Sequence, residues 1–285
     1  MPERGQAASG YAPREVTRLR QGITQTMSDS LAEEVPVAVH YDGEPFAVMM
    51  ASPSDLEDFA YVFSLTEGRT PVGEIEGIEV SPVFEGLLLD IRKRNPEARN
   101  SGSERLLPGR SGCGICGNRL LEDVAKRPAN VGEGVTIEVA ALELALAALQ
   151  SRQPLNSATG ATHAAAWVGL NGTLLLVRED VGRHNALDKL IGAMLRGGVD
   201  TESGFALVTS RASYEMVTKA AIAGISVLAA ISAPTVLAVD LARDCGLCLV
   251  GFVRPGRQVI YSHAHRIRIQ ATAEQLESSD RPSRA

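Results

Sequence analysis

From residue 135 onward the chain alternates between helix-like and strand-like segments, and this alternation restricts its fold more than any other feature. A helical stretch, 135–152, precedes a hairpin, 162–180, whose turn is Asn171-Gly172, and helices and strands then alternate as far as residue 254. Two of the strand runs, FALV and VLAAI, are apolar throughout, which is typical of strands buried on both faces. We therefore predict an α/β core in which helices cover a mainly parallel sheet.

The first part of the chain predicts a smaller α+β subdomain. Strand-like runs at 35–41 and 46–50 flank Asp42-Gly43, a dipeptide that favours a hairpin turn. The sequence Ser54-Asp55-Leu56-Glu57 has the pattern of a capping box and predicts a helix that ends near Gly68, before two further strands. We expect flexible tails at 1–30 and 271–285, this subdomain at 31–130 with a cysteine loop at 93–117, and the core at 131–270.

The charge and apolar content of the chain exclude several classes of protein. The 285 residues carry a net charge of −6 and an isoelectric point near 5.5, which argues against non-specific binding of nucleic acid. No apolar run reaches the roughly 18 residues that a membrane-spanning helix needs, and the first residues lack a secretory signal. With four cysteines and no export signal, we predict a cytoplasmic protein with reduced thiols.

Three junctions between a core strand and the following helix could bind an anionic ligand. They lie at 178–185, 209–215 and 231–235, and helix N-termini at the carboxyl ends of parallel strands favour phosphate. The alternative is that the serines there are helix N-caps and that the arginines pair with neighbouring carboxylates. The candidate ligand-binding residues at these junctions are Arg183, His184, Ser210 and Arg211.

A basic turn, FVRPGRQ at 252–258, follows the last core strand. Phe252 offers a flat ring, and Arg254 and Arg257 offer positive charge. Together these side chains would suit a nucleotide-like anion.

The most reactive feature is a close pair of thiols in the sequence SGCGICG. Cys113 and Cys116 are surrounded by glycines, which leave little side-chain cover over them. Nearby Arg110 and Arg119 would favour the thiolate, the nucleophilic form of cysteine. Such a pair could accept a sulfur atom as a persulfide, or cycle between dithiol and disulfide.

A second C-x-x-C pair, Cys245 and Cys248, raises the question of a metal. Two such pairs could hold zinc, but the second enters a strand, where residues three apart point to opposite faces. We interpret Cys245 and Cys248 as buried small hydrophobic residues. The signature of a zinc deaminase is also missing, because His163 is followed by two alanines and no glutamate. We therefore predict no metal site and no permanently bound cofactor.

Several motifs in combination resemble the FdhD family of formate dehydrogenase accessory sulfur carriers. They are GCGICG, THAAAW, EDVGRHNALDKL, SRASYEMV and LVGFVRPGR, and the resemblance extends over about 33–263. It implies a carrier-type sulfurtransferase with a persulfide intermediate, active in molybdenum cofactor biosynthesis. A cysteine desulfurase would donate the sulfur, and formate dehydrogenase would be the client. The bound substrate would be the molybdenum cofactor as bis-molybdopterin guanine dinucleotide.

The resemblance also assigns a fold and individual residues. It implies a cytidine deaminase-like three-layer sandwich with a smaller second domain, assembled as a homodimer. It implies that Cys113 carries the persulfide, with Cys116 as the second cysteine of the motif. The cofactor-binding turn of the family corresponds here to Phe252, Val253, Arg254, Pro255, Gly256 and Arg257.

Two other functions remain open from the residues alone. One is a cofactor-binding chaperone in which the cysteines are structural. The other is a zinc-stabilised interaction module that uses both C-x-x-C pairs.

Overall fold

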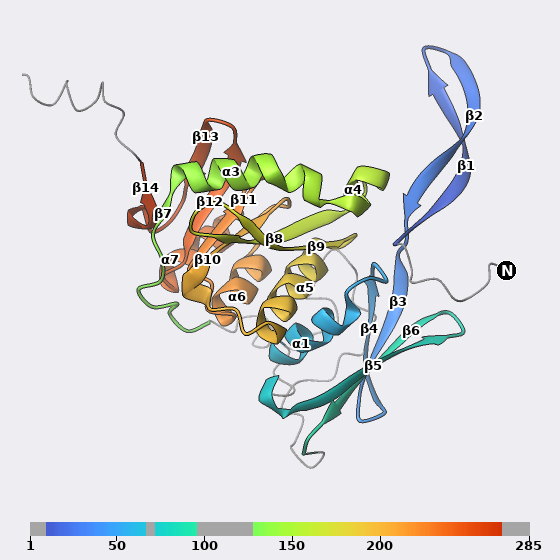
Figure 1. The fold of residues 1–285 in the computed structure, drawn as a ribbon, viewed down its shortest axis with the longest axis horizontal. Coiled ribbons are helices and arrows are strands. Elements are labelled where there is room, and N and C mark those ends of the chain that lie inside the picture. The colour runs from blue at the N-terminus through green and yellow to red at the C-terminus, as the bar shows by residue number, and fades with distance from the viewer. Residues whose placement is uncertain (1–9, 67–71, 96–127, 270–285) are drawn as a thin grey trace, which may run out of the picture.

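The computed structural model describes residues 10–66, 72–95 and 128–269 (Figure 1). Within these ranges the strands form a two-stranded ribbon, a four-stranded sheet, a six-stranded sheet and a short two-stranded pair. No helix in this part of the chain is long and apolar enough to cross a membrane. The predicted tail at 271–285 and most of the predicted cysteine loop, including Cys113 and Cys116, lie outside the described residues.

The four-stranded sheet belongs to the predicted N-terminal subdomain and has the order β4-β3-β6-β5. Alternate residues of β3, such as Val37 and Val39, are buried beneath α1, where they meet Phe59 and Phe63. The predicted hairpin, helix and strands are confirmed, with bounds β3 (Val35–Tyr41), β4 (Glu44–Ala51), α1 (Leu56–Thr66), η1 (Val72–Glu74), β5 (Ile75–Val83) and β6 (Gly86–Lys93).

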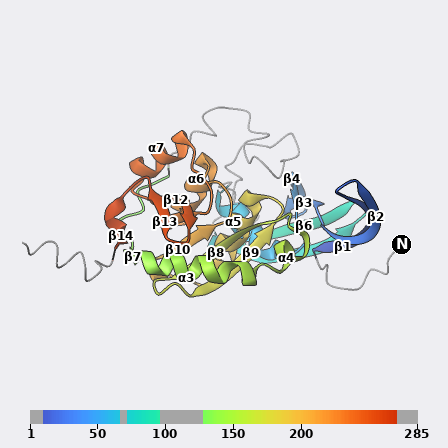
Figure 2. The same cartoon turned by 90° about the horizontal axis from the view of Figure 1, so that it is seen from above.

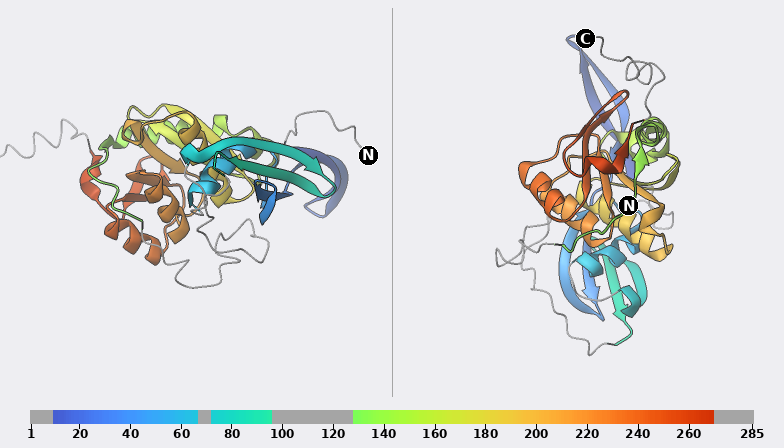
Figure 3. Two further views of the ribbon diagram at one scale, coloured as in Figure 1. Left: turned by 90° about the horizontal axis from the view of Figure 1, so that it is seen from below. Right: turned by 90° about the vertical axis from the view of Figure 1, so that its left-hand side faces the viewer.

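The prediction of a flexible tail at 1–30 is wrong for the residues from Tyr11 onward. Strands β1 (Tyr11–Arg20) and β2 (Ile23–Ala32) form an antiparallel ribbon that projects from the body of the molecule (Figures 1 and 3). Both faces of the ribbon are largely exposed, so its strands show no alternation of apolar and polar residues. Its turn, Gln21-Gly22, has positive φ at both positions, as a tight hairpin turn requires.

The six-stranded sheet has the order β13-β12-β11-β10-β8-β9 and forms the centre of the core. The predicted parallel arrangement is confirmed for β10, β11 and β12. Strands β8, β9 and β13 pair antiparallel, because hairpins join β8 to β9 and β12 to β13, so the sheet is mixed. The bounds are β8 (His163–Gly169), β9 (Leu174–Asp180), β10 (Gly204–Val208), β11 (Val227–Ala230), β12 (Cys248–Arg254) and β13 (Arg257–Ile260).

Helices cover both faces of this sheet and give three layers (Figure 2). Helices α5 (Arg183–Arg196), α6 (Tyr214–Ile222) and α7 (Val236–Asp244) pack on the face that carries Trp167 and Leu228. Helix α3 (Val139–Leu149) packs on the other face, against Phe205 and Val250. The likeness to the cytidine deaminase fold stays a prediction, as do the subdomain boundaries. The remaining elements are β7 (Ile137–Glu138), η2 (Gln150–Arg152), α4 (Pro154–Thr159), η3 (Thr201–Ser203), η4 (Ala264–Arg266) and β14 (Ile267–Arg268).

The two sheets are joined where α1 packs against α5. Gly192 makes this approach possible, because a Cβ at that position would overlap the backbone carbonyl of Asp58. Asp58 in turn accepts hydrogen bonds from Arg178 and Arg196, both at 2.7 Å. These contacts therefore fix the subdomain against β9 and α5 of the core.

Candidate functional site

The carboxyl ends of β9, β10, β11 and β12 lie at one edge of the six-stranded sheet. These strands share a direction, since β9 and β10 are both antiparallel to β8 and β10 to β12 are mutually parallel. The same edge receives the first residue of β8, His163, which lies opposite Asp180 of β9. The predicted junction residues Arg183, His184, Ser210 and Arg211 therefore gather at this edge, as open α/β sheets place their ligand sites.

Two histidines at this edge are held in the neutral form. Burial lowers the pKa of His163, and Arg183 and Arg211 lower it further, against an opposing effect of Asp180. Burial also lowers the pKa of His184 to about 3, with further contributions from Arg183, Lys219 and His163. These interactions place the two histidines near the two junction arginines. An anion bound among these groups would offset the positive charges of Arg183 and Arg211.

His184 connects the N-termini of two helices. Its Nε2 lies 3.2 Å from Oε2 of Glu215 and 3.4 Å from Oγ of Ser213, both on the first turn of α6 or just before it. The neutral ring can therefore donate from Nε2 to the Glu215 carboxylate. Its Nδ1 is buried and has no hydrogen-bond partner among the described residues. A buried acceptor in that state is costly unless a ligand or water supplies a donor.

The serines at these junctions do not act as the N-caps that the alternative interpretation requires. Ser213 occupies the N-cap position of α6 but makes no capping hydrogen bond, and Gly182 at the start of α5 has no side chain to make one. Ser210 Oγ donates instead to the carbonyl of Arg211 at 3.1 Å. Only α7 has a side-chain cap among these three helices, since Thr235 accepts from the N–H of Ala238. Helices α5 and α6 thus begin without a side-chain cap, and a helix N-terminus favours an anion.

The basic turn between β12 and β13 lies further along the same edge. Arg254 ends β12 and pairs in register with Arg257, and neither residue forms an ion pair within the described part of the chain. Arg254 Nη1 donates to the carbonyls of Ile231 at 2.6 Å and Val253 at 3.0 Å, which holds the side chain in place. Val253 itself is buried in the α3-face core, so its side chain cannot reach a ligand.

Phe252 occupies a bulge in β12 and has a backbone φ of 52°. This left-handed conformation is rare for a residue with a large side chain and costs on the order of 1–3 kcal/mol. The ring remains 39% exposed, so it can contact a ligand at the surface. Of the predicted turn residues, Phe252, Arg254, Pro255, Gly256 and Arg257 are all exposed.

The second cysteine pair is buried, as the sequence predicted. Cys245 packs on the face of the sheet that α5, α6 and α7 cover, the α5–α6 face. Cys248 packs on the opposite face, the α3 face. Because the side chains belong to different cores, they do not form a chelating pair. Burial raises the pKa of both thiols, that of Cys248 to about 12, so neither readily forms a thiolate. Within the described ranges, no cluster of histidine, cysteine and acidic residues could hold a metal.

Comparison with known proteins shows the family. A sequence model of the FdhD/NarQ family matches residues 32–268. The chain belongs to the FdhD/NarQ family. A relative from Xanthomonas euvesicatoria pv. vesicatoria (strain 85-10), named sulfur carrier protein FdhD, is 52% identical over 261 residues, which cover 90% of this chain and 92% of that protein. A relative of the same name from Bordetella petrii is 47% identical over 259 residues, covering 90% and 93%.

A solved structure extends the comparison to the fold. It comes from Desulfotalea psychrophila and is described as a candidate formate dehydrogenase accessory protein. The TM-score is 0.73 at 25% identity, and the match covers 90% of this chain and 99% of the other. The arrangement of sheets and helices described above is thus shared with a structure connected by its description to formate dehydrogenase.

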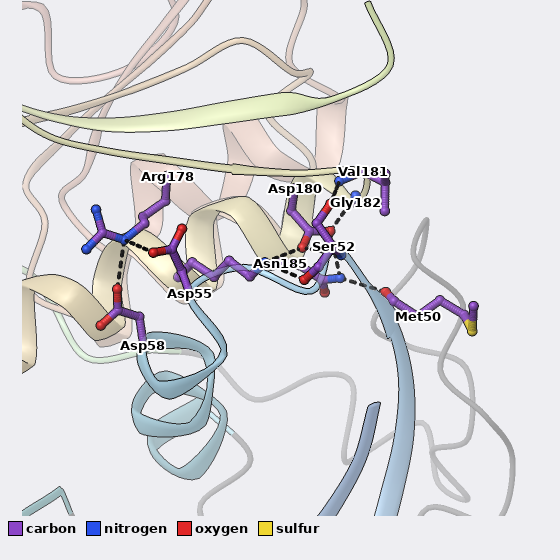
Figure 4. A network of polar contacts seen from close by, with 10 residues as sticks. Met50, Ser52, Asp55, Asp58, Arg178, Asp180, Val181, Gly182 and Asn185 are labelled. Carbon is purple, nitrogen blue, oxygen red and sulfur yellow. Dashed lines mark hydrogen bonds and ion pairs between the residues drawn. The ribbon is translucent and has the colours of Figure 1, made fainter. Parts of the chain in front are cut away.

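This member of the FdhD/NarQ family also contains a buried polar network that the sequence did not reveal (Figure 4). The carboxylate of Asp180 accepts from Lys189 at 2.7 Å, from the N–H of Ser52 at 2.9 Å and from the N–H of Gly182 at 2.7 Å. Asn185 donates to Asp180 and to the carbonyl of Met50. Lys189 and Asp180 are fully buried. The network therefore joins the end of β4 to the start of α5, next to the edge that carries the junction residues.

Proposed function

We propose that this chain is a sulfur carrier required for formate dehydrogenase activity. It accepts persulfide sulfur from a cysteine desulfurase and transfers it to the molybdenum cofactor, bis-molybdopterin guanine dinucleotide, before that cofactor enters formate dehydrogenase. The names of its curated relatives and the description of the solved structure support this function. The proposal includes a cytoplasmic location and a homodimeric assembly. Light scattering on the purified protein would test the homodimer.

The state of the cysteines carries the proposal. Cys245 and Cys248 are buried and their pKa values are raised, so they are poor candidates for a nucleophile. The chain contains four cysteines, and this leaves Cys113 and Cys116 as the pair able to react. The rival zinc module needs both pairs, and the separate packing of Cys245 and Cys248 does not support it.

The proposed chemistry has two steps. The Cys113 thiolate attacks the outer sulfur of the donor persulfide, the S–S bond of the donor breaks, and the donor cysteine leaves as a thiolate. Cys116 then attacks the inner sulfur of the Cys113 persulfide, so that the outer sulfur departs as hydrosulfide to the cofactor and a Cys113–Cys116 disulfide remains. A thiol reductant reduces that disulfide and restores the pair.

We expect the cofactor substrate at the edge of the six-stranded sheet. Its phosphates are expected at the N-termini of α5 and α6, which have no side-chain cap, with Arg183, His184, Ser210 and Arg211 around them. The turn at Phe252–Arg257 lies at the same edge and adds two exposed guanidinium groups. A large anion with several phosphates can contact both places.

Intact-mass measurement after incubation with a cysteine desulfurase and cysteine tests the function. The wild type should gain one sulfur atom, and Cys113→Ala should gain none. Cys245→Ala is the matched control, because it removes a buried thiol and should still gain the sulfur. An adduct that persists in Cys113→Ala removes that residue as the carrier, and no adduct on the wild type favours the cofactor chaperone with structural cysteines.

A further inference from the structure

The β1–β2 ribbon, residues 11–32, extends away from the body of the molecule. It meets the body at its base, where Gly10 lies against Leu155 of α4. From there its two strands pair in register out to the turn at Gln21-Gly22. A two-stranded ribbon is marginally stable in water unless another element packs on it. We therefore expect a further surface to cover the ribbon in the assembled protein.

One face of the ribbon is basic. Arg14, Arg18 and Arg20 lie on the same face, because alternate residues of a strand share a face. Their partners in the register include one acidic residue, Asp29. The three arginines are exposed, and none of them forms an ion pair within the described residues. A surface that covers this face should therefore be acidic.

The tip of the ribbon also exposes large apolar side chains. Leu19 is 69% exposed and Ile23 is 72% exposed, one on each side of the turn. Apolar side chains grouped beside arginines are typical of a surface that binds protein. The complementary surface should therefore carry exposed apolar groups as well as carboxylates.

The β5–β6 hairpin, residues 75–93, carries unpaired carboxylates. Glu79 of β5 lies directly opposite Asp90 of β6. Like charges placed opposite each other destabilise a sheet, and a cation from outside would relieve the repulsion. Arg92 lies against Gly77, and neither carboxylate forms an ion pair in the part of the chain that the structure describes.

The turn of this hairpin adds the apolar groups. Phe84 is 93% exposed, Val83 before it is 41% exposed, and Glu85 after it is also exposed. The hairpin therefore presents an aromatic ring beside carboxylates. This is the complement of the ribbon, which presents Leu19 and Ile23 beside arginines.

The ribbon and the β5–β6 turn lie at the same end of the molecule, away from α7 and β14 (Figures 1 and 2). A twofold rotation about an axis that passes midway between them, at right angles to the line that joins them, exchanges their positions. The ribbon of each copy can then meet the hairpin of the other. Such a dimer is closed and contains the same contact twice.

We propose that two copies of this chain assemble in this way, with the ribbon of each against the β5–β6 hairpin of the other. Leu19 and Ile23 pack on Phe84, and the ribbon arginines pair with the carboxylates of the hairpin. A second copy is the occupant because the complementary surface is on the same chain. The inference rests on the homodimer of the proposed function and names its contact surfaces.

Charge reversal, measured by analytical ultracentrifugation, tests the contact. The wild type should sediment as a dimer. Arg18→Glu with Arg20→Glu should weaken the dimer about hundredfold or more, because like charges then face each other in both copies of the contact. The matched control is Arg243→Glu with Arg268→Glu, which makes the same change of charge at exposed positions on α7 and β14 and should leave the dimer intact.

Reversal of the hairpin supplies a stricter comparison. Glu79→Lys with Glu85→Lys should also dissociate the dimer. An equimolar mixture of the ribbon variant and the hairpin variant should form a dimer again. In the mixture, the new glutamates of one copy face the new lysines of the other, and the two unchanged surfaces face each other. A variant that has lost the dimer by misfolding gains nothing from mixing.

A third variant tests the apolar part of the contact. Phe84 is exposed in the single chain, so Phe84→Ser should have little effect on folding and should weaken the dimer about tenfold or more. The inference is overturned if the wild type is a monomer, if the ribbon variant or Phe84→Ser dimerises as the wild type does, or if the mixture stays monomeric. A monomeric wild type whose ribbon variant also fails to gain sulfur would assign the ribbon to the sulfur donor and not to a second copy.

The sulfur-loading measurement separates this inference from the proposed carrier function. Phe84→Ser should still gain one sulfur atom on Cys113, because the substitution leaves the thiols unchanged. A wild type that dimerises through the ribbon but gains no sulfur supports the contact and refutes the carrier function. A wild type that gains sulfur but sediments as a monomer refutes the contact and leaves the carrier function standing.

Discussion

The two faces of the six-stranded sheet meet the same edge, yet they are built from different kinds of contact. On the α5–α6 face, charged side chains are buried in pairs, Lys189 with Asp180 at 2.7 Å and Lys219 with Asp188 at 2.8 Å. On the α3 face, a cavity of about 450 Å³ lies between α3 and the β12–β13 turn and has apolar walls. The carboxylate of Glu143 in this cavity accepts a hydrogen bond from the N–H of Gly256. Buried ion pairs therefore stabilise the α5–α6 face, whereas the α3 face carries an apolar cavity.

This difference indicates how one edge could hold a ligand with chemically distinct parts. Two helix N-termini without side-chain caps, beside Arg211 and two neutral histidines, suit phosphate. The apolar walls of the cavity suit an uncharged group. A buried ion is strongly destabilising when its partner is removed. We therefore expect substitutions of the buried charged residues on the α5–α6 face to lower stability far more than substitutions that line the cavity.

The largest expected effect is the loss of a buried ion-pair partner on the α5–α6 face. Lys189→Met should lower the free energy of unfolding by about 3–5 kcal/mol, because it leaves the fully buried Asp180 carboxylate without its cation. Denaturant unfolding at neutral pH measures this. Arg243→Ala, at an exposed pair with Asp240, should change stability by less than about 1 kcal/mol.

A double variant separates the lost charge from lost packing. Adding Asp180→Asn to Lys189→Met removes the unpaired charge and should recover part of the lost stability, since the amide oxygen still accepts from the neighbouring N–H groups. A Lys189→Met protein as stable as the wild type, or a double variant less stable than the single one, would show that the pair does not organise this face.

The next expected effect is a pH dependence that belongs to the α5–α6 face. The pKa of His184 is about 3 in the folded chain and 6.5 ordinarily, so the unfolded chain binds more protons between these values. The stability contributed by the neutral ring is complete above pH 6.5 and is lost as the pH falls towards 3. This histidine adds at most about 1.4 kcal/mol per pH unit to the slope.

His184→Gln should flatten the profile in this window, as measured by unfolding at a series of pH values. The groups that face His184 are Arg183, Lys219, Glu215 and His163, and all remain in the variant. His265→Gln, an exposed histidine, should leave the profile unchanged. Parallel profiles for wild type and His184→Gln would show that the burial of this ring carries no such cost.

The parallel centre of the sheet could be predicted from the sequence because each of its strands is a short, continuous apolar run. The runs FALV and VLAAI read directly as strands buried on both faces, and β10 and β11 are buried at every residue. The ribbon at β1 and β2 gave no such signal, since neither face is packed. Its one local clue was Gly22, which has a φ of 79° in the turn.

The candidate site could be predicted only as far as its parts lie near one another in the sequence. The junction residues follow strand ends, so the direction of the strands was enough to bring Arg183 and Arg211 to one edge. The network around Asp180 joins it to Ser52, 128 residues away, and no periodicity reveals such a contact. The charged pair Asp188-Lys189 within the apolar stretch ALDKLIGAML was the available signal.

The smallest expected effect tests whether the two faces bind independently. Arg211 is exposed and forms no ion pair among the described residues, so Arg211→Ala should change stability by less than about 0.5 kcal/mol. It should nevertheless lower the affinity for inorganic pyrophosphate about tenfold, the loss expected for one charge-assisted hydrogen bond.

Arg268→Ala, at the exposed end of β14, is the control. Glu143→Gln should not weaken pyrophosphate, because Glu143 lies on the α3 face of the sheet. If Glu143→Gln weakens pyrophosphate as much as Arg211→Ala does, the two faces do not bind independently.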